Sequence, residues 1–354
     1  MPALARAQTI DVFEVKGVAV DVTDETAAAA RDKALAIGEG LAFRHLLERL
    51  TQRADHEHLP DLPGREIAAY VRDFSIELEK RSAVRYLASL SYRFKPAEVR
   101  RLLTDFGLWF AETPSKPVLV LPVYQIAGTL LLWDEPNPWR DAWNQASARD
   151  GLVPLVHPIG DLSDIAVIGA EQALDGDAQR LAAIARRYEA GDVLVVHGTR
   201  GMDARGERAK LDVVATRYGT AINEQSLVKS FAAGPGDDVD ALLRRAASTL
   251  VQDIEDNWKR DNILRLGDLG VLVVAVPISG LSHWLKIRKR LDGVAVIRRV
   301  DLVLMSLDEV RVNLHHFGSP DQLVLALEQA DLLLSWKGDE AILELLGPAG
   351  DDRS

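Results

Sequence analysis

Four polar residues in the middle of the chain have the types and spacing that could form a ligand site. Tyr124, His157, His197 and Thr199 each end or closely follow a stretch that is predicted to be a strand. In open α/β sheets, ligands bind at the edge where parallel strands end, and imidazole, phenol and hydroxyl groups can all hydrogen-bond a small molecule there. The sequence therefore offers a small-ligand site, although ordinary hydrogen bonds at strand ends explain the same residues more simply.

The other groups that could do chemistry do not form a catalytic or metal-binding pattern. His56 and His58 lie in a polar loop, and His315 and His316 are neighbours in a predicted strand, so their side chains point to opposite faces. The glycine-rich stretch 198–206 lacks the Gly-Lys-Ser/Thr ending of a phosphate-binding loop and is predicted to be a hairpin turn. The sequence contains no cysteine, which excludes thiolate chemistry and Cys-containing metal sites. We therefore predict a non-enzymatic protein with no cofactor and no metal site.

Three tryptophans lie close together in the sequence. Trp139 and Trp143 are four residues apart, which places them on one face of a predicted helix, and Trp133 lies just before it. Aromatic side chains at helical spacing usually fill a core, so core packing is the favoured interpretation. The alternative is an exposed aromatic patch, formed by all three, that anchors a partner protein.

Composition excludes some partners. A formal net charge of -11, without clusters of basic and aromatic residues, opposes the phosphate backbone and excludes nucleic acid as a main partner. The longest apolar runs, 118–123 and 269–277, are far shorter than the roughly 20 residues of a transmembrane helix. Ala5, Arg6 and Ala7 before Gln8 have the small-x-small form of a signal-peptidase site, which predicts a periplasmic protein; a cytoplasmic one is the alternative.

The chain is predicted to be an α/β protein made of three modules in series. Residues 9–112 give a βαββα order, in which period-two alternation predicts strands at 9–18 and 85–94. Residues 115–265 alternate strands with helices and then add two consecutive strands that continue the sheet antiparallel, which predicts a mixed, mostly parallel sheet. Residues 268–346 give βαββαβ, which is the order of a ferredoxin-like unit.

Several segments resemble the DUF2066 family of uncharacterised bacterial proteins, namely residues 13–20, 116–122, 139–143 and the final module. The middle of the chain, around 178–198, is also similar to the first domain of TolB-type and curli-secretion-type envelope proteins. This resemblance implies an exported protein of unknown activity, with no catalytic residues to carry over. We therefore expect a periplasmic scaffold or binding protein with an envelope protein partner, of open oligomeric state. The alternative is a small-ligand-binding or hydrolytic domain at the central sheet.

Overall fold

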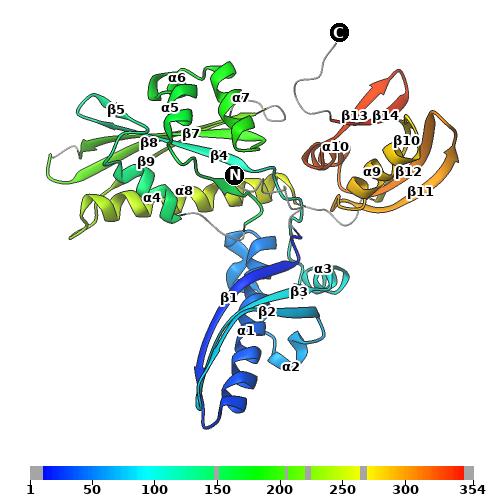
Figure 1. The fold of residues 1–354 in the computed structure, drawn as a ribbon, viewed down its shortest axis with the longest axis horizontal. Helices are drawn as coiled ribbons and strands as arrows, with labels where there is room; N and C mark the ends of the chain where they lie inside the picture. Colours follow the sequence, from blue (N-terminus) through cyan, green and yellow to red (C-terminus); the bar gives the residue numbers. More distant parts are fainter. Residues whose placement is uncertain (1–10, 147–150, 204–205, 220–224, 264–268, 347–354) are drawn as a thin grey trace. The chain divides into compact units, whose positions relative to one another are not determined.

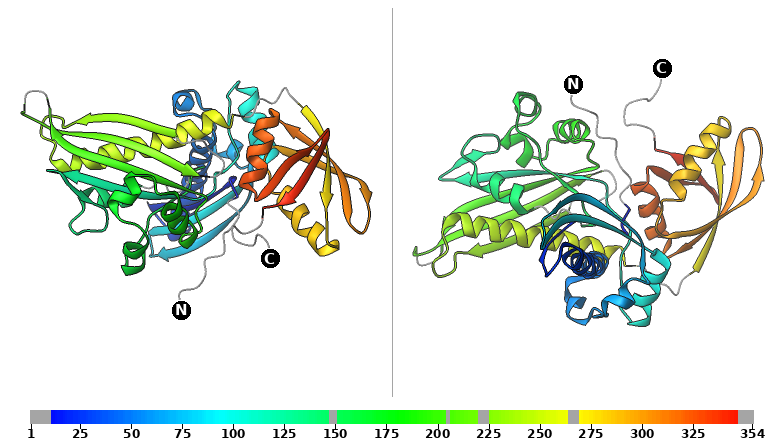
Figure 2. Two further views of the ribbon diagram at one scale, coloured as in Figure 1. Left: turned by 90° about the horizontal axis from the view of Figure 1, so that it is seen from above. Right: turned by 60° about the horizontal axis from the view of Figure 1, so that its bottom comes forward.

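The computed structural model describes residues 11–146, 151–203, 206–219, 225–263 and 269–346. Within them the protein is α/β, with three separate sheets that follow one another along the chain (Figure 1). Two compact units are present. Among the described residues, one is Ser115–Asn257, and the other combines residues 11–114 with those after 257. Figure 2 shows the same elements from two further sides.

The first sheet has three antiparallel strands in the order β1-β3-β2, with a long helix packed on one face. Its elements are β1 (Glu14–Thr23), α1 (Ala27–Leu50), the 3-10 helix η1 (Arg53–His58), α2 (Gly64–Ile67), β2 (Val71–Arg81), β3 (Arg85–Phe94) and α3 (Pro96–Asp105). The strand predicted at 9–18 lies at 14–23. A bulge at Gly17, whose φ is +67°, shifts the alternation so that Val18, Val20 and Val22 continue the buried face.

The second sheet belongs to the unit Ser115–Asn257 and runs in the order β5-β4-β7-β8-β9, with β6 beside the start of β4. The elements of this part are β4 (Val118–Ile126), β5 (Thr129–Leu131), α4 (Pro138–Ala146), β6 (Leu155–Val156), α5 (Leu162–Val167), α6 (Ala170–Leu174), α7 (Ala178–Arg187), β7 (Asp192–Met202), β8 (Ala209–Gly219), β9 (Gln225–Ala232) and α8 (Val239–Asp261). In Figure 1, α5, α6 and α7 lie on one side of this sheet and α4 and α8 on the other.

The second sheet is mixed, as expected, but it is not mostly parallel. Among its described strands only β4 with β6 and β4 with β7 are parallel, whereas β4–β5, β7–β8 and β8–β9 are antiparallel. The antiparallel β5 was not predicted because it is only three residues long and follows a two-residue turn at Ala127 and Gly128. The turn predicted at 198–206 is shorter than expected, because residues 198–202 belong to β7 and Met202 pairs with Ala209 of β8.

The third sheet has five strands in the order β11-β12-β10-β14-β13. Its part of the chain contains β10 (Leu269–Pro277), α9 (Leu281–Leu291), β11 (Ile297–Met305), β12 (Glu309–Phe317), α10 (Pro320–Gln329), β13 (Leu332–Lys337) and β14 (Glu340–Leu345). The first six elements follow the predicted βαββαβ order. The ferredoxin-like expectation is incomplete, because β14 was missed and lies between β10 and β13, parallel to β10 and antiparallel to β13.

Helix length and hydropathy bear on membrane insertion. None of the helices in the described ranges combines the length and the apolar character that crossing a bilayer requires.

Candidate functional site

His197 and Thr199 lie together on the second sheet with a residue that the sequence did not single out, Gln125. The Nε2 atom of His197 is 3.1 Å from Oε1 of Gln125, and the Thr199 hydroxyl donates to the same oxygen at 3.3 Å. The three share a face because β4 and β7 pair in parallel, with Val123 opposite His197 and Gln125 opposite Thr199. Two of the four predicted ligand residues are therefore brought together.

The other two predicted ligand residues do not join them. Tyr124 precedes Gln125 in β4, so its side chain points to the opposite face, where it is fully buried. His157 directly follows β6, whose last residue pairs with Leu119, four positions before Val123. At about 3.3 Å per residue, that is roughly 13 Å along β4. The expectation that all four meet at one rim is wrong, because β4 and β7 continue past these residues and β6 ends early.

Burial sets the protonation state of these two histidines. Burial lowers the pKa of both His157 and His197, so both imidazoles are neutral at pH 7. The two groups that hydrogen-bond His197 Nε2, the Gln125 amide and the Thr199 hydroxyl, are themselves neutral. These contacts of His197 are therefore hydrogen bonds between neutral groups. In the described ranges, no three His, Asp or Glu side chains gather as metal ligands would.

Trp139 and Trp143 belong to the core of the central unit. Both side chains are fully buried, their rings meet edge to face at 5.8 Å, and Trp139 Nε1 donates to the carbonyl oxygen of Val196 at 3.1 Å. An exposed aromatic patch made of all three tryptophans is therefore contradicted, because two of them are inaccessible. Trp133 is only half-buried, and its Nε1 donates to the carbonyl oxygen of Ile168 at 2.6 Å.

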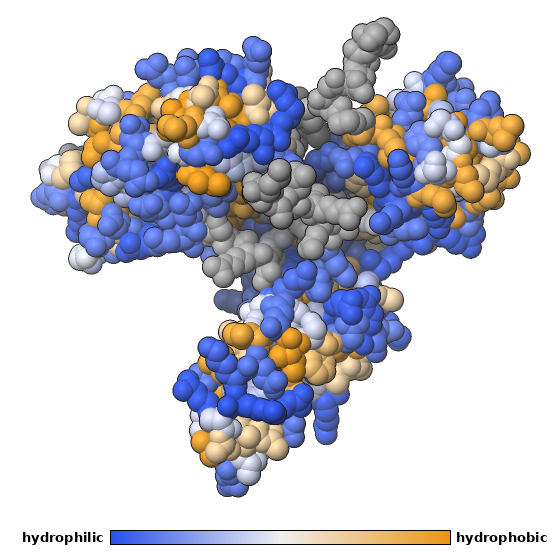
Figure 3. Space-filling model, in the orientation of Figure 1, coloured by the Kyte–Doolittle hydropathy of each residue, from blue (hydrophilic) through white to orange (hydrophobic). Residues whose placement is uncertain are grey.

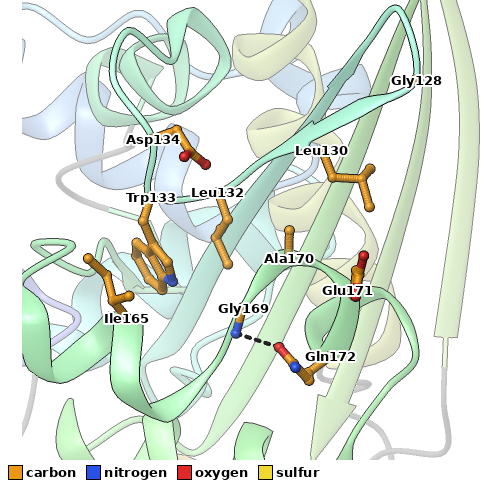
Figure 4. A pocket seen from close by; sticks show the side chains of 10 residues that line it. All are labelled: Gly128, Leu130, Leu132, Trp133, Asp134, Ile165, Gly169, Ala170, Glu171 and Gln172. Carbon is orange, nitrogen blue, oxygen red and sulfur yellow. Dashed lines mark hydrogen bonds between the residues drawn. The ribbon is translucent and has the colours of Figure 1, made fainter.

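Trp133 forms part of a hollow of about 600 Å³ in the central unit. The hollow lies between the β4–β5 hairpin with the loop after it, and the segment that carries α5 and α6 (Figure 4). Its lining residues are Gly128, Leu130, Leu132, Trp133, Asp134, Ile165, Gly169, Ala170, Glu171 and Gln172. Leu130, Leu132 and Trp133 give it an apolar wall. A volume of this order lies within the range of small-molecule sites.

Two carboxylates at the hollow give it a negative charge. Asp134 and Glu171 are exposed, and neither has an ion-pair partner in the part of the chain that the structure describes. The surrounding sequence, residues 127–177, contains nine acidic and two basic residues, a net charge of -7. An occupant of the hollow would therefore gain from apolar surface combined with positive charge.

Three large apolar side chains beside the hollow are exposed, and we call them the apolar ridge. They are Ile159, Leu162 and Ile165, with 79%, 84% and 48% of their surface exposed. Ile165 also lines the hollow, so the ridge and the hollow are continuous. Figure 3 shows hydrophobic residues gathered over α5 and α6, with hydrophilic residues around them. Clustered apolar side chains on a surface are a common mark of protein–protein contact.

A set of charged and polar groups around the buried Asp164 carboxylate, the Asp164 network, holds the ridge in place. The Asp164 carboxylate is fully buried and accepts hydrogen bonds from Gly160 N at 2.9 Å, the Tyr188 hydroxyl at 2.6 Å and Arg187 Nε at 2.7 Å. Arg187 also donates to Asp161 at 2.7 Å, and the Tyr188 hydroxyl accepts from Ile159 N at 2.9 Å. Along the chain, the exposed ridge residues therefore alternate with Gly160, Asp161 and Asp164, whose hydrogen bonds hold this segment in place.

The pKa of Asp164 follows from these contacts. Burial alone would raise it, but the hydrogen bonds from Tyr188, Gly160 and Arg187, together with the charge of Arg187, outweigh burial and lower the pKa of Asp164. The carboxylate is therefore charged at neutral pH, as the contact with Arg187 requires.

Sequence reasoning missed the ridge because it missed α5 and α6. Both helices are shorter than two turns, so a helical hydrophobic period cannot develop in them. One local signal was available. Asp161 caps α5, and its carboxylate accepts from the backbone N–H groups of Ser163 and Asp164, both at 2.9 Å.

Comparison with known proteins adds no relative. The sequence matches no protein-family model, and no curated protein is similar to it.

Proposed function

We propose that this chain is a non-enzymatic binding protein, and that the hollow with the apolar ridge is the surface that receives a partner protein. The observation that carries the proposal is the combination of exposed Ile159 and Leu162 with the Asp164 network beneath them. Exposed apolar side chains that are held in a fixed arrangement lose little conformational entropy on binding. The surface is therefore preorganised to receive a partner.

The chemistry of the surface defines the partner's contact segment. Covering Leu162 or Ile159 completely is worth about 1.5–3 kcal/mol each, so apolar side chains must supply much of the affinity. Asp134 and Glu171 favour Lys or Arg beside those apolar groups. We therefore expect a segment that presents Leu- or Ile-like side chains together with basic ones.

A periplasmic location is also part of this proposal. It is supported by the small-x-small sequence before Gln8, the absence of cysteine and the DUF2066 resemblance, all of which fit an envelope protein partner. Residues 1–10 lie outside the described ranges. Mass spectrometry of the native N-terminus tests the location: a chain that begins at Gln8 supports export, and a native chain that keeps Met1 contradicts it.

Site-specific crosslinking in cells tests the docking surface. A photo-activatable residue replaces Leu162 in one variant and Val228, which is exposed on β9 of the same unit, in the control. We expect crosslinking from position 162, not from 228, to a defined protein segment with apolar and basic side chains. Changing Ile159 and Ile165 to Ser should remove that crosslink. Equal crosslinking from both positions, or a bound small molecule in the hollow instead of a protein, would contradict the proposal.

A further inference from the structure

Helix α9 of the third sheet's part of the chain presents an exposed face that matches the hollow. Leu281 and Leu285, four residues apart, are 59% and 57% exposed, and Lys286 and Lys289 are exposed beside them. Residues at these spacings are neighbours on one side of a helix. The face therefore combines two leucines with two lysines.

The rest of α9 keeps this face in place. Trp284, Ile287 and Leu291 are buried on its other side, and Arg288 Nε pairs with Asp292 at 3.1 Å in the last turn. The helix is thus folded into its own module and presents its exposed residues without having to form on binding. That lowers the entropic cost of using it as a contact surface.

The charge around α9 is opposite to that of the chain as a whole. Residues 281–299 contain six basic residues and one acidic residue, a net charge of +5 in a chain of net charge -11. Arg288 and Arg290 have carboxylate partners in Asp292 and Asp331. Lys286 and Lys289 have no ion-pair partner in the described ranges, so their charges are available to another molecule.

We propose that the occupant of the hollow and the apolar ridge is α9 of a second copy of this chain. This inference rests on the proposed function and names its partner. Leu281 and Leu285 would cover the ridge, while Lys286 and Lys289 would face Asp134 and Glu171. Each surface offers apolar side chains that can cover those of the other, and the unpaired charges of the two surfaces have opposite signs.

A second copy is favoured over an anionic lipid surface because of the area that α9 offers. A helix that lies in a membrane interface buries its whole apolar face in the lipid. Trp284 and Ile287 of α9 already pack inside the protein, which leaves only Leu281 and Leu285 for lipid. Reciprocal docking would close a two-fold dimer, and one-way docking would continue head to tail. In both cases the average mass of the particles in solution rises with the protein concentration.

Complementary charge reversal tests this pairing. One variant carries Asp134→Lys and Glu171→Lys at the hollow, and the other carries Lys286→Glu and Lys289→Glu on α9. Alone, each variant sets like charges against each other, so sedimentation should show an apparent dissociation constant raised about tenfold or more relative to the unmodified chain. Mixed, the two variants restore opposite charges at both possible contacts, and self-association should return. High ionic strength should weaken it in the unmodified chain.

A matched control carries Lys80→Glu and Arg81→Glu, two exposed basic residues at the end of β2, and should associate like the unmodified chain. The inference is overturned if the unmodified chain stays monomeric at every concentration, or if the mixture of variants fails to associate. It is also overturned if Lys286→Glu with Lys289→Glu changes only binding to vesicles that contain anionic lipid. In each of these cases a partner crosslinked at Leu162 would leave the proposed function standing, so the two failures can be told apart.

Discussion

Replacing Asp164 with Asn removes the charge at the centre of the Asp164 network and keeps the size of the side chain. In the native network one carboxylate oxygen accepts from Arg187 Nε and the other accepts from both Gly160 N and the Tyr188 hydroxyl. An amide has only one acceptor oxygen, so either rotamer turns an N–H group toward a donor. At least one charge-assisted hydrogen bond is lost.

The size of the effect follows from that loss. A hydrogen bond to a charged group contributes about 1.5–3 kcal/mol, so we expect local opening of the ridge to become easier by about 2 kcal/mol. Since 1.4 kcal/mol is a factor of ten, the opening equilibrium should rise about 30-fold. Hydrogen exchange measures this directly at the backbone N–H groups of Ile159 and Gly160, which the network holds.

The control is Asp175→Asn, which makes the same chemical change at an exposed position after α6. It should leave exchange at Ile159 and Gly160 unchanged.

The lowered pKa of Asp164 sets the pH range of the effect. Its contribution is present at neutral pH and is lost as the pH falls below about 3.9 and through the folded-state value. If Asp164→Asn exchanges at the native rate at pH 7, the ridge is not held by this network and the reasoning is refuted.

Two further predictions concern the central unit. Trp139→Ala should destabilise it by about 3–5 kcal/mol, lowering the thermal midpoint by about 10 °C, because it removes a fully buried ring; an unchanged midpoint in thermal denaturation would contradict its place in the core. Burial lowers the pKa of His157 and His197, so between pH 7 and pH 5 the unfolded chain takes up protons that these folded histidines do not. Stability should fall over that range, and His157→Gln with His197→Gln should flatten the dependence in urea titrations at several pH values.

Much of the fold could be predicted because alternation and helix signals are local. The strand Arg85–Phe94 has the same bounds in the sequence analysis and in the structure, since Tyr86, Ala88 and Leu90 alternate with exposed or half-buried residues along its first half. Such a pattern is decided by one face of one strand, and it needs no knowledge of what lies across the sheet.

Elements that depend on distant partners were harder to predict. Nothing local in Glu340–Leu345 indicates that this strand inserts beside β10, because the pairing of Val274 with Ala341 joins residues far apart in the sequence. The direction of neighbouring strands in the central sheet likewise depends on which strands pair, as for β4 with β7. Pattern reasoning therefore found most strands but gave the wrong balance of parallel and antiparallel pairs.

The candidate site was predictable only in part. His197 and Thr199 are neighbours as expected, because residues two apart in a strand share a face. Tyr124 is the neighbour of Gln125 in β4, so by the same rule it faces the other side of the sheet and cannot join His197. The ridge around Leu162 could not be found from hydrophobicity, since an apolar residue in sequence looks the same whether it is buried or exposed. Exposure depends on what packs against the side chain, and in the structure Leu162 is 84% exposed.

The position of β14 has a consequence for how the protein is made. The ribosome synthesises β13 before β14. In the described sheet β13 pairs only with β14, so β13 cannot join the sheet until β14 has been synthesised. Until then β10 also presents one bare edge, which is the kind of surface that recruits stray strands. A stop codon or a protease cut at Gly338 would make that temporary state permanent. Shortened chains should therefore aggregate or be degraded, although they lack only one small strand of this sheet.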